Sequence, residues 1–384
     1  MELTKCKLGE LITQRREKND GSDLPICGVS KDGLIPPKQK DADTSIYNVF
    51  YRDDFIFNPA RMELNSIAIN DMYDRAICSS LYEVFYVHRT DLLLPHYLEL
   101  IIRQKWFTRY CEFLGQGSAR EYCRFGNISE IEIEFPPIEE QQKIVEYNTA
   151  IENRIALKQK INDNLVAVGT ASIQKNVGRG ALINLTEAEM DSLTFPEDFK
   201  VKTVSEFCAE TKSGSTPSRI NNEYWENGTI SWVKSGEVHN NITLQTEEYI
   251  TPLGLSESST KLLPKDTVLM AMYGVTAGEV GYLAIEATTN QAICGMICRS
   301  KAEAAYLYFS LIQSQAKISR LSNGGAQDNL SKNFIDNIKI AVPPSEFIEK
   351  LNLAAIVEQM TLNTKEITLL EELQATVLAQ LSSH

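Results

Sequence analysis

A duplicated segment constrains the fold of this chain more than any other feature of its sequence. Residues 115–137, GQGSAREYCRFGNISEIEIEFPP, align without a gap to residues 322–344, SNGGAQDNLSKNFIDNIKIAVPP, and seven positions are identical. Weaker similarities lie upstream, where KLGELI resembles TVSEFC in pattern and RAIC matches QAIC. Because the period is about half of the 384 residues, the sequence predicts a tandem pair of domain-sized units rather than a short-period solenoid.

Each copy of the duplicated segment predicts a strand that leads into a long helix. Residues 131–135 alternate apolar side chains with glutamate, and 338–342 repeat the period of two that is typical of a half-buried strand. A Pro-Pro pair then ends the strand and suits the first turn of a helix. Segments 138–168 and 345–384 contain neither Gly nor Pro and place apolar residues three and four apart. The sequence therefore predicts two helices much longer than the usual 8–20 residues.

Two long helices that leave equivalent points of a duplicated domain can pair with each other. A pseudo-two-fold relation between the halves would make the pair antiparallel, a coiled-coil rod between two globular domains. The alternative is that each helix packs on its own domain. Lys158 and Asn162 interrupt the first apolar stripe, so the pattern is not a strict zipper. The residues expected at the helix and partner interface are Ile144, Ile151, Ile155, Leu165, Leu351, Val357, Leu370 and Val377.

The predicted fold class is α+β, with two mostly-β domains in tandem. Both halves contain short β-like runs separated by turns, and each has one helical stretch, at 94–114 and at 302–321. The predicted boundaries are 1–137 for the first domain, 138–178 for the central helix, 179–344 for the second domain and 345–384 for the C-terminal helix.

Composition excludes several classes of protein. No run of about 18 apolar residues is present, which argues against a membrane span and predicts a cytoplasmic protein. The eight Cys form no CxxC motif and the four His are scattered, so we expect reduced thiols and no metal site. The net charge of −13 argues against a nucleic-acid binder, because phosphate contacts normally need a basic surface.

No catalytic constellation is found in the sequence. FNPARM at 57–62 resembles the Asn-Pro-Pro-aromatic motif of adenine methyltransferases, but Ala60 and Arg61 replace its last two residues. GVTAGEVG at 274–281 lacks the Lys and Ser/Thr of a P-loop, and neither GxSxG nor HExxH occurs. The chain is therefore predicted to have no catalytic residues.

Several of these stretches resemble the specificity subunits of type I restriction–modification systems. FPPIEEQQKIVEYNTAIENRI resembles the segment that opens the central conserved region of that family, and AVPPSEFIEKL resembles a diverged second copy without the Glu-Gln pair. DFIFNPARMELNSIAI, FPEDFKVKTVSEF, SGSTPSRINNEYWENGTISW and GGAQDNLSKNFIDNIKIAVPP resemble parts of its target-recognition domains. Together these stretches cover most of the chain and occur in the expected order twice.

The resemblance implies a non-catalytic subunit that binds double-stranded DNA at a bipartite site. Each half would be a target-recognition domain, and the helical rod would set the spacer and dock two modification (methyltransferase) subunits. Two restriction (translocase and nuclease) subunits could join the complex. This subunit would bind no cofactor, whereas its partners would use S-adenosylmethionine, ATP and Mg. The alternatives are a coiled-coil scaffold without a DNA role and a specificity subunit of a type II-like modification enzyme.

Polar loops rich in Gly, Ser and Asn supply the candidate DNA contacts, although such loops are also ordinary turns. Their Arg, Lys, Ser, Thr, Asn and Gln side chains can reach phosphates and base edges. No segment of the chain is basic overall, so we expect this subunit to bind DNA weakly without its partners. The predicted DNA-binding residues are Arg61, Ser118, Arg120, Arg124, Thr216, Ser218, Arg219, Lys234, Gln327 and Asn329.

Overall fold

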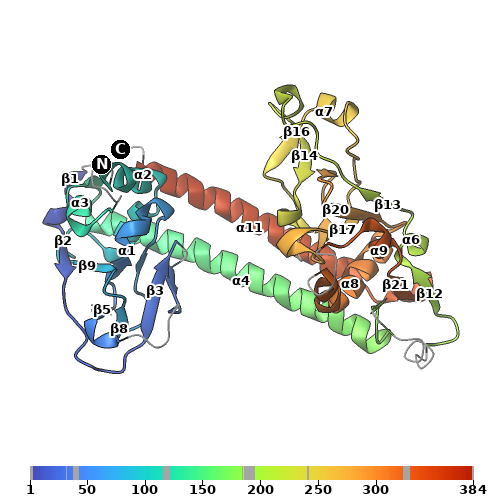
Figure 1. The fold of residues 1–384 in the computed structure, drawn as a ribbon, viewed down its shortest axis with the longest axis horizontal. Coiled ribbons are helices and arrows are strands. Elements are labelled where there is room, and N and C mark those ends of the chain that lie inside the picture. The colour runs from blue at the N-terminus through green and yellow to red at the C-terminus, as the bar shows by residue number, and fades with distance from the viewer. Residues whose placement is uncertain are drawn as a thin grey trace. The chain divides into compact units, whose positions relative to one another are not determined.

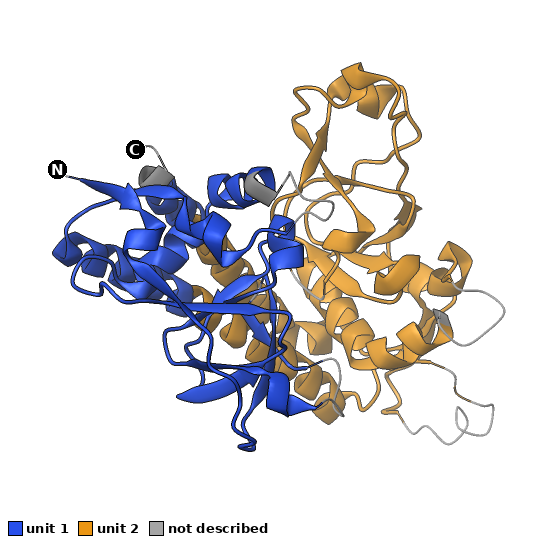
Figure 2. Cartoon of the chain, turned by 60° about the vertical axis from the view of Figure 1, so that its left-hand side comes forward, with its two compact units in different colours: residues 1–154, 370–384 blue, residues 155–369 orange. Residues whose placement is uncertain are grey.

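The chain divides into two compact units. In this computed structural model, the structure describes residues 3–31, 33–37, 43–115, 122–183, 185, 195–239, 242–322 and 329–382. Unit 1 comprises Met1–Arg154 and Leu370–His384, and unit 2 comprises Ile155–Leu369 (Figure 2). The boundaries between the units fall inside two long helices, so each unit contains a part of both helices.

Unit 1 begins with strands and ends with helices (Figure 1). Its elements are β1 (Thr4–Lys7), η1 (Leu8–Glu10), β2 (Ile12–Arg15), β3 (Ile26–Ser30), β4 (Gly33–Ile35), η2 (Thr44–Ile46), β5 (Asn48–Tyr51), β6 (Phe55–Phe57), η3 (Pro59–Leu64), β7 (Ile67–Ile69), β8 (Arg75–Cys78), β9 (Glu83–Val87), α1 (Pro95–Ile102), α2 (Lys105–Gly115), α3 (Phe125–Ser129), β10 (Glu132–Phe135) and the first part of α4 (Ile138–Asn176).

The strands of unit 1 form three sheets around aromatic cores. The strand orders are β1-β10, β2-β9-β6-β7 and β4-β3-β8-β5. Phe55 stacks on Phe85 across β6 and β9, with ring centroids 4.9 Å apart. The predicted helix over 94–114 is in fact two helices, α1 and α2, separated at Arg103–Gln104. The break allows both segments to bury apolar side chains in the same core, including Ile101 and Phe107.

Unit 2 contains the end of α4, most of a second long helix, and a larger set of strands (Figure 1). Its elements are β11 (Ala181–Leu182), β12 (Lys200–Thr203), α6 (Val204–Phe207), β13 (Glu210–Ser213), η4 (Asn222–Tyr224), β14 (Ile230–Val233), η5 (Ser235–Glu237), β15 (Ile242–Thr243), β16 (Glu248–Ile250), α7 (Pro252–Ser256), β17 (Thr267–Ala271), η6 (Gly274–Thr276), β18 (Val280–Leu283), β19 (Thr288–Thr289), β20 (Ile293–Ile297), α8 (Lys301–Ser322), α9 (Lys332–Asp336), β21 (Lys339–Val342), α10 (Ser345–Lys350) and α11 (Leu353–Ser382), which ends in unit 1.

The strands of unit 2 also form three sheets, in the orders β11-β21-β12, β13-β20-β17-β18-β15 and β16-β14-β19. Helix α8 supplies Tyr306, Leu307, Tyr308 and Phe309, all fully buried in the main core. The same core takes in Ile173 of α4 and residues of α11. Gly169 allows a close approach of α4 to α8, because a Cβ there would meet the Phe309 ring at 2.3 Å.

The tandem repeat predicted from the sequence is visible in the order of elements. In unit 1, β1 pairs antiparallel with β10, a short helical turn follows β1, and α4 follows the Pro-Pro pair after β10. In unit 2, β12 pairs antiparallel with β21, α6 follows β12, and α10 follows the second Pro-Pro pair. The two predicted strands before the prolines are therefore confirmed, and their apolar side chains are buried. Both units are mixed α/β structures built on sheets.

The second long helix is interrupted where the sequence predicted one continuous helix. Helix α10 ends at Lys350, and α11 begins at Leu353 after Asn352, whose backbone is left-handed with φ of 53°. Asn tolerates this conformation better than most residues, and no Gly or Pro marks the break. Helix α4, in contrast, runs unbroken from Ile138 to Asn176, close to the range that the sequence predicted.

Polar side chains join α4 and α11 within each unit. In unit 2, the Asn363 amide donates to Asn162 Oδ1 at 2.9 Å, and Lys158 Nζ lies 2.7 Å from Glu366. In unit 1, Gln374 donates to Asn148 at 3.0 Å. Residue numbers rise along α4 as those of their partners on α11 fall, so the contacting stretches in unit 2 run antiparallel. Lys158 and Asn162, which interrupt the apolar stripe of α4, are therefore each paired with a polar residue of α11.

No helix in the described part of the chain is long and apolar enough to cross a membrane. The described residues also hold no cluster of three or more His, Cys, Asp or Glu placed to bind a metal ion. All eight cysteines are unpaired by disulfides, and six of them are buried.

Candidate nucleic-acid interface

A cavity in unit 1 brings together two of the predicted contact residues. Arg61, on η3, and Arg124, just before α3, both line a hollow of about 1320 Å³ with Asn58, Tyr82 and Tyr122. Asn58 uses its side-chain oxygen to accept the backbone N–H of Ala60 at 3.1 Å, so it caps η3. The resemblance of FNPARM to a methyltransferase motif therefore has a structural explanation, since capping is a common role of Asn before a helical turn.

The two arginines of this cavity differ in their electrostatic surroundings. Arg124 lies 3.4 Å from Glu83, and its guanidinium lies 5.5 Å from the centre of the Tyr122 ring. Glu83 also accepts the backbone N–H of Phe125 at 2.8 Å. This hydrogen bond fixes the carboxylate next to Arg124. Arg61 is exposed and makes no ion pair with any residue that the structure describes. Arg61 is therefore the better placed of the two to attract a phosphate.

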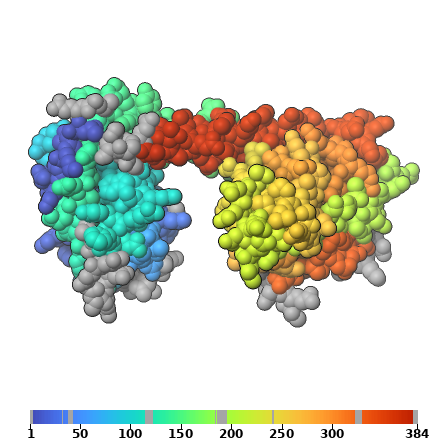
Figure 3. All heavy atoms as spheres, turned by 90° about the horizontal axis from the view of Figure 1, so that it is seen from above, coloured from blue at the N-terminus to red at the C-terminus, as the bar shows by residue number. Residues whose placement is uncertain are grey.

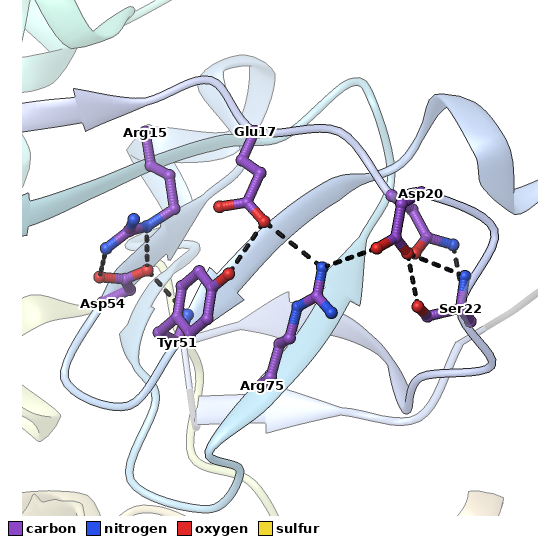
Figure 4. A network of polar contacts seen from close by, with 8 residues as sticks. Arg15, Glu17, Asp20, Ser22, Tyr51, Asp54 and Arg75 are labelled. Carbon is purple, nitrogen blue, oxygen red and sulfur yellow. Dashed lines mark hydrogen bonds and ion pairs between the residues drawn. The ribbon is translucent and has the colours of Figure 1, made fainter.

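Other basic residues of unit 1 are engaged in a structural network (Figure 4). Arg15 contacts Asp54 through two hydrogen bonds of 2.6 and 3.0 Å, and Asp54 is 1% exposed. Tyr51 donates to Glu17 at 2.9 Å, and Arg75 lies 3.4 Å from the same carboxylate. Burial raises the pKa of Asp54, against the lowering by the Arg15 hydrogen bond. The network joins Arg15 of β2 and Asp54, the residue before β6, to β5 and β8 of the neighbouring sheet. Its cations are therefore already paired with carboxylates.

In unit 2, Arg219 is held between two indole rings and a carboxylate. Its guanidinium carbon lies 3.6 Å from the centre of the Trp225 ring and 4.9 Å from that of Trp232. Nη1 donates to Glu248 Oε2 at 2.5 Å. The hydrogen bond from Arg219 lowers the pKa of Glu248, and Lys234 adds to the effect. The sequence suggested the basic and aromatic members of this cluster but missed Glu248, which lies 29 residues away at the start of β16.

The two tryptophans also fix the loop that carries Arg219. Trp225 Nε1 donates to the backbone oxygen of Ser218 at 3.1 Å, and Trp232 Nε1 donates to that of Ser215 at 3.0 Å. The indole rings meet edge to face, with centroids 5.0 Å apart. Residues 215–219, which we name the Arg219 loop, therefore pack on a rigid pair of indole rings. In the space-filling view, the yellow-green part of the chain that includes this loop lies at the surface of unit 2 (Figure 3).

The remaining predicted DNA contacts have varied surroundings. Lys234 lies 2.5 Å from Glu247 and 3.3 Å from Glu248, and its pKa is raised, first by the Glu247 hydrogen bond. Thr216 donates to Gln291 at 2.6 Å, while the side chains of Ser218 and Asn329 are exposed. Ser118, Arg120 and Gln327 lie outside the described residues. Lys234 and Arg219 share one carboxylate, so the structure brings these two predicted residues together.

The predicted helix-interface residues occupy several environments. Ile144 packs against the core of unit 1, whereas Leu165, Leu351 and Val357 pack in the core of unit 2. Ile151, Ile155, Leu370 and Val377 are partly buried along their helices. Their role at the helix and partner interface stays a prediction. The polar residues that do join the helices, including Asn148, Asn363 and Gln374, were not identified from the sequence.

Comparison with known proteins places the chain in a family. The sequence model described as "Type I restriction modification DNA specificity domain" matches residues 6–167 and again residues 196–375. The chain therefore belongs to this family and carries two copies of its domain. The two matches begin near β1 and near β12, the strands that open the repeated arrangement.

Individual relatives agree with this assignment. The type I restriction enzyme EcoR124I/EcoR124II specificity subunit of Escherichia coli is 25% identical over 200 residues, which cover 51% of this chain and 46% of that protein. The HindI specificity subunit of Haemophilus influenzae is 22% identical over 76% of this chain and 77% of its own length. The crystal structure of a type I S subunit from M. genitalium aligns over 99% of this chain and 96% of that one, with a TM-score of 0.59 and 15% identity. This last likeness shows a shared fold.

Proposed function

We propose that this chain is the non-catalytic DNA-specificity subunit of a type I restriction–modification enzyme. The observation that carries the proposal is that the specificity-domain model matches the chain twice, over 6–167 and 196–375. Both units also begin and end with the same order of elements. Each unit would recognise one part of a bipartite site in double-stranded DNA. The Arg219 loop in unit 2 and the cavity with Arg61 and Arg124 in unit 1 are the candidate contact surfaces.

The paired helices α4 and α11 would set the length of the unspecified spacer and make the coiled-coil rod. Polar contacts such as Asn162 with Asn363 support this role, because a buried polar pair selects one register of a helix pair. A fixed register would give a fixed spacer length. A pseudo-two-fold relation between the two halves, as the sequence repeat predicts, would then match the two parts of the DNA site.

Exposed apolar side chains on the helices of unit 2 offer a docking face for a modification subunit. Leu362 and Leu369 of α11 are each 56% exposed and lie two turns apart on one face. Leu157 and Val168 are similarly exposed on α4. Two modification subunits would use S-adenosylmethionine to methylate adenine, and two restriction subunits with ATP and Mg could join them.

Weak DNA binding by the isolated subunit follows from the charge distribution. The net charge is −13, and Arg124, Arg219 and Lys234 are each paired with a carboxylate. A cation that is already paired gains less from a phosphate, since the electrostatic part of DNA affinity comes from neutralising phosphates. Tight binding would therefore require the modification subunits, which add contacts to the duplex.

The test is to express this chain with its candidate modification subunit in a host without adenine methylation and to map N6-methyladenine across the genome. A two-part motif with a fixed gap would support the proposal and reveal the site. A stable complex without methylation would contradict the specificity role. If no complex forms, a scaffold without a DNA role becomes the better explanation. Leu362→Glu with Leu369→Glu should prevent the complex from forming, whereas Lys265→Glu, at an exposed position away from the helices, should not.

A further inference from the structure

We infer that Arg219 is a specificity-determining residue that reads a guanine in the half-site recognised by unit 2, with Glu248 as the residue that positions it. The inference rests on the proposed function, because it assigns a base to one of the proposed recognition surfaces. It starts from the contacts that hold the guanidinium in the Arg219 loop.

The plane of the Arg219 guanidinium is fixed before any DNA arrives. Trp225 and Trp232 contact it at 3.6 and 4.9 Å, and both indoles are themselves tied to backbone oxygens of the loop. Gly214, the residue before the Arg219 loop, approaches Thr289 so closely that a Cβ would meet the Thr289 backbone oxygen at 2.1 Å. A planar group that is held in this way loses little conformational freedom on forming a bidentate contact.

The guanidinium still has hydrogen-bond donors to offer. It carries five N–H groups, of which one donates to Glu248, and no other acceptor among the described residues contacts it. The Arg219 side chain is 51% exposed. Arginine donates in bidentate fashion to O6 and N7 of guanine, the commonest specific contact in the major groove. The unused donors therefore suit a base edge.

A phosphate is the less suitable ligand for Arg219 because its charge is already matched. Glu248 lies 2.5 Å from Nη1, so a phosphate would enter next to a carboxylate. Lys234, 3.3 Å from Glu248, neutralises it only in part because Lys234 also pairs with Glu247 at 2.5 Å. Neutral base edges suffer no such repulsion. The neighbouring Ile220 is 96% exposed, and an apolar side chain at this place suits the thymine methyl group in the groove. Arg219 and the adjacent Ile220 thus form a pair suited to reading bases rather than to anchoring a phosphate.

The experiment compares genome-wide methylation motifs of the complex containing wild-type chain, Arg219→Lys, Glu248→Gln and the control Lys265→Ala. Arg219→Lys keeps the positive charge but removes the planar fork. We expect it to accept other bases at one guanine position of one half-site, with discrimination there falling roughly 5- to 150-fold. The other half-site should remain unchanged, which also shows that the protein is folded. Lys265, an exposed cation elsewhere on unit 2, should leave the motif intact when changed to Ala.

Glu248→Gln tests the positioning role by a different readout. The amide can still accept a hydrogen bond from Arg219 but no longer neutralises it. We expect partial relaxation at the same guanine position, together with a steeper salt dependence of DNA binding. If Arg219→Lys gives no methylation, this variant alone carries the test.

Three results would overturn the inference. The first is a wild-type motif without guanine in either half-site, and the second is an unchanged motif for both variants. The third is a methylation level that falls equally at all sites for Arg219→Lys, with no change in base preference at any position, which would make Arg219 a phosphate anchor. Failure of the proposed function is distinguishable from these, because the wild-type complex would then show no bipartite motif at all.

Discussion

Replacing Asn363 with a smaller residue should strongly destabilise the contact between α4 and α11 in unit 2. Its side chain is 1% exposed and donates to Asn162 Oδ1 at 2.9 Å, and its own oxygen accepts from Lys158 Nζ at 3.1 Å. Asn162 is itself only 8% exposed. Asn363→Ala removes the donor and leaves the Asn162 oxygen buried without a partner.

The expected cost follows from the groups left unpaired. A buried acceptor that loses its donor costs about 1–3 kcal/mol. Lys158 adds little to this cost because Glu366, at 2.7 Å, still accepts from it. A loss of about 2 kcal/mol corresponds to roughly 30-fold more frequent local opening. Replacing both partners, in Asn162→Leu with Asn363→Leu, should cost less than the single change, since the buried Asn162 oxygen is then removed together with its donor. Gln359, which also donates to Asn363, is exposed and can bond to water instead.

Amide hydrogen exchange is the appropriate assay because it reports local opening. Global unfolding of a chain with two units is not a two-state process, so a single free energy of unfolding would be poorly defined. Exchange would be followed in peptides from 155–169 and 355–369 of the complete chain. Glu358→Ala serves as the control, because Glu358 is exposed on the same helix and its removal should change exchange by about twofold or less.

An increase of less than threefold for Asn363→Ala would refute the reasoning. So would a double variant that exchanges faster than the single one, because that result would mean that the polar pair contributes net stability. A double variant close to wild type in exchange but with altered spacer length in its methylation motif would support the role of this pair in setting register.

Two further predictions concern unit 2. Gly169→Leu should destabilise the contact of α4 with α8 by about 1–3 kcal/mol, because the new side chain must displace the buried Phe309 ring; faster amide exchange in α8 would show it, and unchanged exchange would contradict the close approach. The pKa of Glu248 is lowered from 4.5 by Arg219, so its stabilisation of the Arg219 loop should be present above pH 4.5 and lost as pH falls through the folded value. Indole fluorescence in a Trp106→Phe background measures this loss, and an acid transition that persists in Glu248→Gln would argue against it.

Local patterns determined the framework of this protein. The alternation in 131–135 and 338–342 predicted two strands, and the gap-free repeat predicted two units, because side-chain period and duplication are properties of neighbouring residues. The absence of Gly and Pro after the proline pairs predicted the long helices for the same reason. The break at Asn352 was not predicted, because an Asn with a left-handed backbone does not change the apolar spacing that predicts a helix.

Tertiary structure alone decided which polar groups meet. Arg219 and Glu248 lie 29 residues apart, Arg124 and Glu83 lie 41 apart, and Asn162 and Asn363 lie 201 apart. From the sequence, each arginine was a candidate DNA contact, to a phosphate or a base edge, and Asn162 was an interruption of an apolar stripe. Periodicity places a side chain on a face of its own helix or strand, but it contains no information about the residue that faces it across the fold. The charge left available for DNA depends on those partners, so only the folded chain determines it.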